Sequence, residues 1–209
     1  MVKVKFCGLT QIKDIDVAIE AGVDAVGFVF VKKSVRYITA TDAKPLIEKA
    51  KAAGLLTVAL FADQDAEEVK SVLSQSQADI IQFHGNETET FCLQFGKPYW
   101  KAIPMLQNTD WKNYLKQYPS ASALLLDAYD KTHSGGSGQS FSWFKFPVNE
   151  KSRWILAGGL SEQNIQQALE ATHAEFVDVS SGIEQLAGVK SEEKMLAFVK
   201  QLKNYNNIN

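Results

Sequence analysis

Two hydrophobic periods alternate along the whole chain, and this alternation limits the possible folds more than any other feature. Short apolar runs such as Leu55–Phe61 are followed by longer stretches whose apolar residues recur at helical spacing, as Ile12, Ile15 and Ile19 do. A nearly continuous apolar run suits a strand with both faces buried, and a helix between two such strands connects them in parallel. The pattern therefore predicts a parallel sheet covered by helices.

Eight such strands are expected, at Lys3–Gly8, Asp24–Phe30, Leu55–Phe61, Asp79–Gly85, Tyr99–Ile103, Ala123–Asp127, Trp154–Ala157 and Phe176–Val179. Successive units are spaced roughly 20 to 30 residues apart, as a (β/α)8 barrel requires. We therefore predict the α/β class and a (β/α)8 barrel with short loops, in which residues 1–209 form a single domain. A doubly wound open sheet is the alternative. It is less favoured because the glycine-rich run 135–138 is followed by Phe141, where a dinucleotide-binding motif needs its third glycine.

Turn and capping residues predict where the helices begin and end. The first two helices should end at Gly22 and Gly54, and the second should begin near Thr41, with Pro45 close to its first turn. Further N-terminal caps are expected at Asp65, Asn86 and Ser161, a helix around Trp111–Leu115, a last helix from about Ser191, and a frayed tail at residues 204–209.

Composition limits the partners and the setting of the chain. The net charge of -2, from 22 basic and 24 acidic residues, gives no reason to expect nucleic acid or an anionic membrane as partner. No apolar run approaches the roughly 20 residues that span a bilayer, and the N-terminus does not read as a signal peptide. Cys7 and Cys92 are too few for a disulfide framework, so a cytoplasmic location is expected. The histidines match no zinc spacing, and a monomer is favoured, although the sequence does not determine the oligomeric state.

Reactive side chains are expected at the C-terminal ends of the strands, where the active site of such a barrel lies. They are a thiol, a histidine, two carboxylates and, in the loop after the second strand, an arginine: Cys7, His84, Asp127, Asp178 and Arg36. Because the strand ends of a barrel share one rim, the pattern predicts that these groups converge on a common site.

Several of these residues also have a purely structural interpretation. Cys7 could be a small buried apolar residue, and Asp127 could cap the loop that follows it. His84 could make a structural hydrogen bond, and Arg36 could be a solvated loop charge. Cys92, inside the expected fourth helix, is interpreted as part of the core. A functional role is favoured for Asp127, since a carboxylate directly after three leucines is otherwise costly to bury.

Small residues after the last two strands form the clearest binding signal. They are Gly158 and Gly159 after the seventh strand, and Ser180, Ser181 and Gly182 after the eighth. Many barrels bind phosphate at this position through backbone N–H groups and a short extra helix, which Ile183–Leu186 could supply. Two ordinary turns are the alternative, because glycine and serine are common in turns.

Seven motifs, in order along the chain, carry a resemblance to a known family: Lys5–Thr10, Ser34–Tyr37, Gln82–Gly85, Leu125–Asp127, Gly135–Gly138, Ala157–Leu160 and Asp178–Glu184. Together they resemble the phosphoribosylanthranilate isomerase family of tryptophan biosynthesis. Each motif alone is weak, but their combination runs from the first strand to the last helix and is specific.

The resemblance implies a (β/α)8 barrel that catalyses an Amadori rearrangement of N-(5-phosphoribosyl)anthranilate, a small-molecule substrate, without cofactor or metal. It implies that Cys7 is the general base and Asp127 the general acid, and that Arg36 holds the anthranilate carboxylate. His84 and Asp178 would line the site, and the glycine and serine turns would hold the phosphate. Because a free thiol titrates near 8.5, a nearby positive charge should lower the pKa of Cys7.

The sequence departs from the family pattern at Val35, Ser142, Ala187 and Ser191, which puts loop rigidity in doubt more than the type of reaction. One rival interpretation is the sister sugar-phosphate isomerase of histidine biosynthesis, which uses an aspartate where Cys7 stands. Another is a barrel without activity that binds a phosphorylated metabolite. A thiol redox protein is a third, weakened because Cys7 lacks a C-x-x-C partner.

Overall fold

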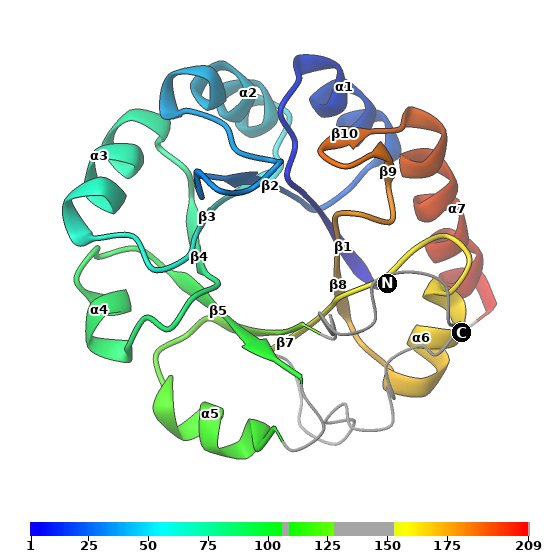
Figure 1. Ribbon diagram of the computed structural model, residues 1–209. Helices are drawn as coiled ribbons and strands as arrows, with labels where there is room; N and C mark the ends of the chain where they lie inside the picture. Colours follow the sequence, from blue (N-terminus) through cyan, green and yellow to red (C-terminus); the bar gives the residue numbers. More distant parts are fainter. Residues whose placement is uncertain (106–108, 128–152, 209) are drawn as a thin grey trace.

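The computed structural model describes residues 1–105, 109–127 and 153–208. Eight parallel strands form a closed barrel in which each strand pairs with the next and β8 returns to β1, with the helices around the outside (Figure 1). The predicted α/β class and (β/α)8 barrel are thus confirmed. The glycine-rich run 135–138, together with Phe141 and Ser142, lies outside the described residues.

The barrel strands are β1 (Lys3–Cys7), β2 (Ala25–Val29), β3 (Leu56–Phe61), β4 (Ile80–Phe83), β5 (Tyr99–Pro104), β6 (Ala123–Asp127), β7 (Trp154–Ala157) and β8 (Phe176–Val179). The described helices are α1 (Ile12–Ala21), α2 (Ala40–Ala52), α3 (Ala66–Ser76), α4 (Glu89–Leu93), α5 (Trp111–Gln117), α6 (Ile165–Thr172) and α7 (Glu192–Ile208). A separate two-stranded sheet, β9 (Glu184–Leu186) with β10 (Val189–Lys190), lies between β8 and α7 in the chain. None of these described helices has the length and apolar composition needed to cross a membrane.

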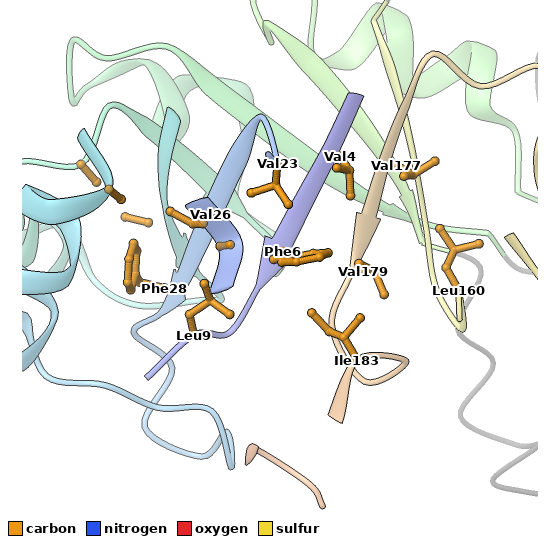
Figure 2. Packing of buried hydrophobic residues seen from close by; sticks show 14 of the residues in the cluster. Val4, Phe6, Leu9, Val23, Val26, Phe28, Leu160, Val177, Val179 and Ile183 are labelled. Atoms are coloured by element: carbon orange, nitrogen blue, oxygen red, sulfur yellow. The ribbon is translucent and has the colours of Figure 1, made fainter. Parts of the chain in front are cut away.

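The strands are buried on both sides, as their nearly continuous apolar runs predict. Val4 and Phe6 of β1 belong to a large apolar cluster between the barrel wall and the helices (Figure 2). Because successive side chains of a strand point to opposite faces, Lys5 and Cys7 face the barrel interior. A second cluster, built on strand residues, fills the interior around Trp100, whose ring meets that of Phe176 edge-on at a centroid distance of 5.5 Å.

Several predicted helix boundaries agree with the structure. Gly22 ends α1 in the left-handed conformation, at φ 76°, which a glycine adopts without steric strain. Asp65 caps α3 by accepting the N–H of Glu68. Ser191 directly precedes α7 as predicted, and Cys92 is fully buried in α4.

Two helices begin later than predicted. α4 begins after Thr88 rather than Asn86, because the Asn86 N–H donates to the carboxylate of Asp63 at 2.6 Å and lies in the preceding loop. α6 begins after Asn164 rather than Ser161, because the Ser161 N–H donates to the Asn164 side-chain oxygen at 2.8 Å. In both cases the side chain of another residue, 23 positions away for Asn86 and three for Ser161, accepts the backbone N–H of the predicted cap.

The prediction of a short helix at Ile183–Leu186 is wrong, since residues from Glu184 onward form β9, which pairs antiparallel with β10. α7 continues to Ile208, and fraying of this end stays a prediction. Asn206 in this last part accepts the Val2 N–H at 3.0 Å and so ties the end of α7 to the beginning of the chain.

Phe83, the last residue of β4, is fully buried beneath the loop that carries His84. Its ring packs against those of Phe61, Phe91, Phe95 and Tyr99, at centroid distances of 6.4, 5.9, 5.8 and 6.1 Å. Phe83→Ala should lower the free energy of unfolding by about 3–5 kcal/mol, because it removes a large side chain and leaves a cavity. Chemical denaturation measures this. Leu93→Ala, at a side chain 51% exposed, is the control, and a similar loss in both variants would contradict the packing argument.

Candidate active site

A cavity of about 460 Å³ opens at the C-terminal ends of the strands. Nine of the ten predicted site residues line it: Cys7, Arg36, His84, Asp127, Gly158, Gly159, Asp178, Ser180 and Ser181. The tenth, Gly182, is not among the lining residues. A Cβ there would collide with the Leu160 carbonyl, so the lack of a side chain at position 182 lets the turn after β8 pack against the turn after β7. The cavity has the size of typical small-molecule sites, roughly 300–1,000 Å³.

The base of the cavity holds a buried ion pair between neighbouring strands. The register of β1 and β8 sets Lys5 beside Asp178, and the Lys5 Nζ donates to Asp178 Oδ1 at 2.8 Å. Lys5 is fully buried and Asp178 is 8% exposed. Cys7, two residues after Lys5, ends β1 on the same inward face and is 4% exposed. The thiol therefore lies next to both members of the pair.

The pKa of Cys7 is set by opposing effects. Burial is the largest and raises it, and the negative charge of Asp178 acts in the same direction. The ammonium groups of Lys5 and Lys190 lower it but do not outweigh burial. The net shift in the pKa of Cys7 is upward. The prediction that its pKa is lowered is therefore wrong, although the nearby positive charges on which that prediction rested are present. At neutral pH the thiolate is the minor form.

His84 connects the predicted acid to the barrel wall. Its Nε2 lies 3.0 Å from Asp127 Oδ2, and its Nδ1 lies 3.2 Å from the side-chain nitrogen of Gln82. Because an amide nitrogen can only donate, Nδ1 accepts from Gln82, and a neutral ring then carries its proton on Nε2. That proton points at the Asp127 carboxylate. His84 and Asp127 thus form one hydrogen-bonded unit on the cavity wall.

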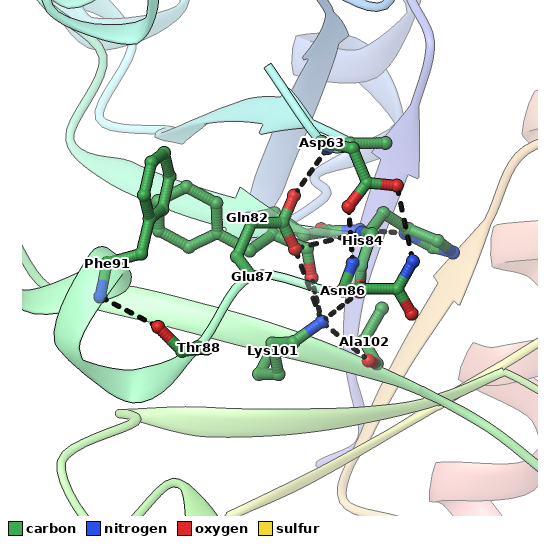
Figure 3. A network of polar contacts seen from close by, with 12 residues as sticks. Asp63, Gln82, His84, Asn86, Glu87, Thr88, Phe91, Lys101 and Ala102 are labelled. Carbon is green, nitrogen blue, oxygen red and sulfur yellow. Dashed lines mark hydrogen bonds and ion pairs between the residues drawn. The ribbon is translucent and has the colours of Figure 1, made fainter. Parts of the chain in front are cut away.

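A buried polar network fixes the loop that carries His84 (Figure 3). The carboxylate of Glu87 accepts the N–H of Asp63 at 2.8 Å and that of Gly85 at 3.0 Å. The Lys101 ammonium donates to the Gly85 carbonyl at 2.6 Å and lies 3.4 Å from the Glu87 carboxylate. Since Glu87 and Lys101 are both buried, these bonds hold the loop far more firmly than exposed ion pairs would.

Arg36 is already paired with a carboxylate within the protein. Its Nε and Nη2 donate to the two carboxylate oxygens of Glu184 at 2.6 and 2.8 Å. Lys190 also donates to Glu184, at 2.8 Å, and to the Ser180 carbonyl, at 3.0 Å. A substrate carboxylate would therefore have to meet the guanidinium at its Nη1–Nη2 edge or displace Glu184.

The predicted phosphate end differs from expectation in its construction. Gly158 and Gly159 have positive φ angles of 87° and 65°, so the turn after β7 requires residues that tolerate the left-handed region. The short helix expected after β8 is replaced by the β9–β10 hairpin. The side-chain nitrogen of Asn164 donates to the Gly159 carbonyl at 2.9 Å and fixes that turn instead.

Four residues of the site are not predicted from the sequence: Lys5, Gln82, Glu184 and Lys190. Lys5 and Gln82 had a usable signal, because each is a long polar side chain at an inward position of an otherwise apolar strand. Glu184 and Lys190 had no such signal in the sequence. The contact between them depends on the β9–β10 hairpin, which the sequence pattern does not predict. Within residues 1–105, 109–127 and 153–208, no three His, Cys, Asp or Glu side chains are grouped so that they could hold a metal ion.

Glu184 should stabilise the fold in a pH-dependent way. Its burial acts to raise its pKa, but the hydrogen bonds from Arg36 and Lys190 outweigh this and hold the pKa below its ordinary value. The stabilisation is therefore present above the unfolded pKa and is lost as the pH falls through the folded one. Glu184→Gln should cost about 3–5 kcal/mol near pH 7, because it leaves buried positive charge uncompensated.

Denaturant unfolding between pH 7 and pH 3 checks this prediction, and the difference between wild type and Glu184→Gln should shrink towards the acid end. The control is Glu67→Gln, which removes an exposed partner of Lys70 and should cost less than about 1 kcal/mol at any pH. A difference for Glu184→Gln that does not change with pH would mean that packing, rather than charge, is lost.

Comparison with known proteins gives the family. The family model described as N-(5'phosphoribosyl)anthranilate (PRA) isomerase matches residues 4–201. The chain is 41% identical over 197 residues to the N-(5'-phosphoribosyl)anthranilate isomerase of Marinomonas sp. (strain MWYL1), covering 94% of this chain and 96% of that one. It is 40% identical over 198 residues to the Neisseria meningitidis protein of the same name, covering 95% of both chains.

Solved structures agree with the sequence comparisons. The phosphoribosyl anthranilate isomerase of Thermotoga maritima superposes with a TM-score of 0.87 at 33% identity, over 98% of this chain and all of that one. A phosphoribosyl anthranilate isomerase in complex with reduced 1-(o-carboxyphenylamino)-1-deoxyribulose 5-phosphate gives a TM-score of 0.84 at 30% identity, with the same coverage. The resemblance of the sequence motifs is confirmed: the chain belongs to the N-(5'-phosphoribosyl)anthranilate isomerase family.

Proposed function

We propose that this chain carries out the isomerisation for which its family is named, in tryptophan biosynthesis, with Cys7 as general base and Asp127 as general acid. The observation that supports these roles is that both side chains, from β1 and β6, line one cavity of suitable size. The substrate is N-(5'-phosphoribosyl)anthranilate, and the product is its 1-deoxyribulose isomer.

The reaction begins with a proton from Asp127 to the oxygen of the furanose ring. The C1–O bond breaks, and the nitrogen lone pair forms a C1=N double bond, which gives an iminium ion. Its positive charge makes the C2 proton acidic. Cys7 as thiolate takes that proton, and the C2–H electrons form a C1=C2 double bond while the C=N electrons return to nitrogen. The resulting enolamine tautomerises to the ketone.

The His84–Asp127 hydrogen bond positions the acid. Protonated Asp127 gives its own proton to the ring oxygen, and the Nε2–H of neutral His84, which donates to Asp127 Oδ2 at 3.0 Å, stabilises the carboxylate that forms. Gln82 donates to the other ring nitrogen and so keeps Nε2 directed at Asp127.

The two ends of the substrate are assigned to different residues of the cavity wall. The phosphate is proposed to bind the turns that contain Gly158, Gly159, Ser180 and Ser181, where small residues allow the backbone to come close to an anion. The anthranilate carboxylate is proposed to bind Arg36, with Glu184 either sharing the guanidinium or giving way. Asp178 takes part through Lys5 rather than by facing the substrate alone.

The cytoplasmic location expected from the composition is proposed here as well. Both cysteines of the chain are free and buried, which suits a reducing cytoplasm. The expectation of a monomer stays a prediction.

Asp127→Asn tests the acid. The amide keeps the shape of the side chain but has no acidic proton, so the turnover number should fall about 10²–10⁴-fold while affinity for the product stays within a few-fold. Steady-state kinetics and product titration by calorimetry measure the two effects. A loss of turnover below tenfold, with the chemical step rate-limiting, would assign the acid role to another group.

Arg36→Met tests which end of the substrate the guanidinium serves. Binding of ligands that carry the anthranilate carboxylate should weaken about tenfold or more, whereas ribose 5-phosphate should bind nearly as before. Lys33→Met, an exposed cation of the same loop outside the cavity wall, is the control and should leave both affinities unchanged. Equal losses for both ligands in Arg36→Met would show that Arg36 acts through the fold of the loop or its general charge.

A further inference from the structure

Lys5 has no task of its own in the reaction scheme above, where it appears only as the partner of Asp178. It is a fully buried lysine in the barrel interior, and burying an ammonium group is costly unless its charge is compensated. Asp178 compensates it at 2.8 Å. Replacing such a pair by apolar residues is often neutral or stabilising, so the pair needs an explanation other than stability.

The path of the Lys5 side chain points to that explanation. On the neighbouring strand β2, Gly27 lies beside Cys7 in the register. A Cβ placed on Gly27 would lie 2.7 Å from Lys5 Cε, 3.1 Å from Lys5 Nζ and 3.1 Å from the Cys7 sulfur. The ammonium group and the sulfur thus meet in the space that a side chain at position 27 would fill. Gly27 sits inside a strand, so close approach explains this glycine.

We propose that Lys5 is a positioning residue of the active site, whose ammonium, held between Asp178 and Cys7 over Gly27, supplies the positive charge that stabilises Cys7 as thiolate. The inference rests on the proposed function of Cys7 as base, but its test does not depend on turnover.

The charges around Cys7 support this assignment. From its own strand the sulfur faces Lys5, from β8 it faces Asp178, and from β10 it faces Lys190. Burial raises the pKa of Cys7 most, and Lys5 provides the largest opposing effect, by charge and by hydrogen bonding; Lys190 contributes less.

Asp178 keeps Lys5 charged. Burial acts to lower the pKa of Lys5, but the charges of Asp178 and Cys7 raise it above its ordinary value. Asp178 by itself disfavours a thiolate, because both are negative. Lys5 is therefore needed between them, and the three groups work as a chain in the order Asp178, Lys5, Cys7.

The test measures the rate at which iodoacetamide alkylates Cys7 in the intact protein as a function of pH, with peptide mass mapping to identify the modified cysteine. The midpoint of this pH profile reports the pKa of the Cys7 thiol. In Lys5→Met the fraction of thiolate at neutral pH should fall about 10- to 1000-fold, and the midpoint should move to higher pH. The alkylation rate at fixed pH should fall less, roughly threefold for each tenfold loss of thiolate, because a more basic thiolate is more nucleophilic.

Lys101→Met is the matched control. Lys101 is also a buried lysine of the barrel wall paired with a carboxylate, but it lies beside Glu87 and is absent from the groups that act on Cys7. It should leave the Cys7 midpoint unchanged. Cys92, fully buried in α4, reports on folding in every sample, since its alkylation marks unfolded protein.

If Lys5→Met does not fold, Gly27→Ala tests whether Lys5 stabilises the Cys7 thiolate. It removes no charge, but its new Cβ must displace the flexible end of Lys5 from the sulfur. The Cys7 midpoint should again move to higher pH while Cys92 stays unreactive. An unchanged midpoint in folded Lys5→Met, or in Gly27→Ala, would overturn the proposal. Failure of the base assignment would look different: Cys7→Ala would keep its activity, whatever Lys5 does to the thiol.

Discussion

Closure of the eight-stranded barrel is the constraint on which the rest of the structure depends. A closed ring of strands has no free edges, and its pleat sends alternate side chains inward, where the space is narrow and shut off from water. At the N-terminal end Trp100 and Phe176 fill that space. Towards the C-terminal ends the inward residues become smaller or polar, as at Gly27 and Cys7, and the interior opens into the cavity. The site therefore follows from a change of side-chain size along the barrel axis.

Polar groups in such an interior are stabilised by bonding to one another. Lys5 and Asp178 do so directly, and Gln82, His84 and Asp127 are joined in series, although the Gln82 Oε1 atom has no hydrogen-bond partner among the described residues. Each set joins strands that are not neighbours in sequence, so each also fixes the relative position of groups around the rim. The same pairing that makes burial tolerable sets the charge on the reacting side chains, and for this reason structure and chemistry cannot be separated at this end of the barrel.

Prediction from the sequence succeeded wherever a property is local. Strand runs such as Leu55–Phe61 and the inward or outward alternation along β1 depend on neighbouring residues alone, and strand ends in a barrel meet by topology, which is why nine predicted residues line one cavity. It failed where a contact joins distant residues. Lys5 and Asp178 are 173 positions apart, and Arg36 and Glu184 are 148 apart, so no pattern of spacing reveals them. The upward shift in the pKa of Cys7 was not predicted for a different reason: burial of the thiol outweighs the positive charges near it.

The departures from the family pattern acquire a physical meaning from these distant contacts. Val35 stands next to Arg36, and Ala187 lies in the turn between β9 and β10, one residue before Gly188. A Cβ on Gly188 would lie 2.5 Å from the Val35 carbonyl, so these two substitutions fall where the loop after β2 touches the hairpin. Both segments are joined by the Arg36–Glu184 pair, whereas Cys7 and Asp127 are held by strands of the barrel wall. Changes at this contact can alter how firmly Arg36 is held against Glu184, and hence how readily it turns to a carboxylate on the substrate, without moving the groups that transfer protons.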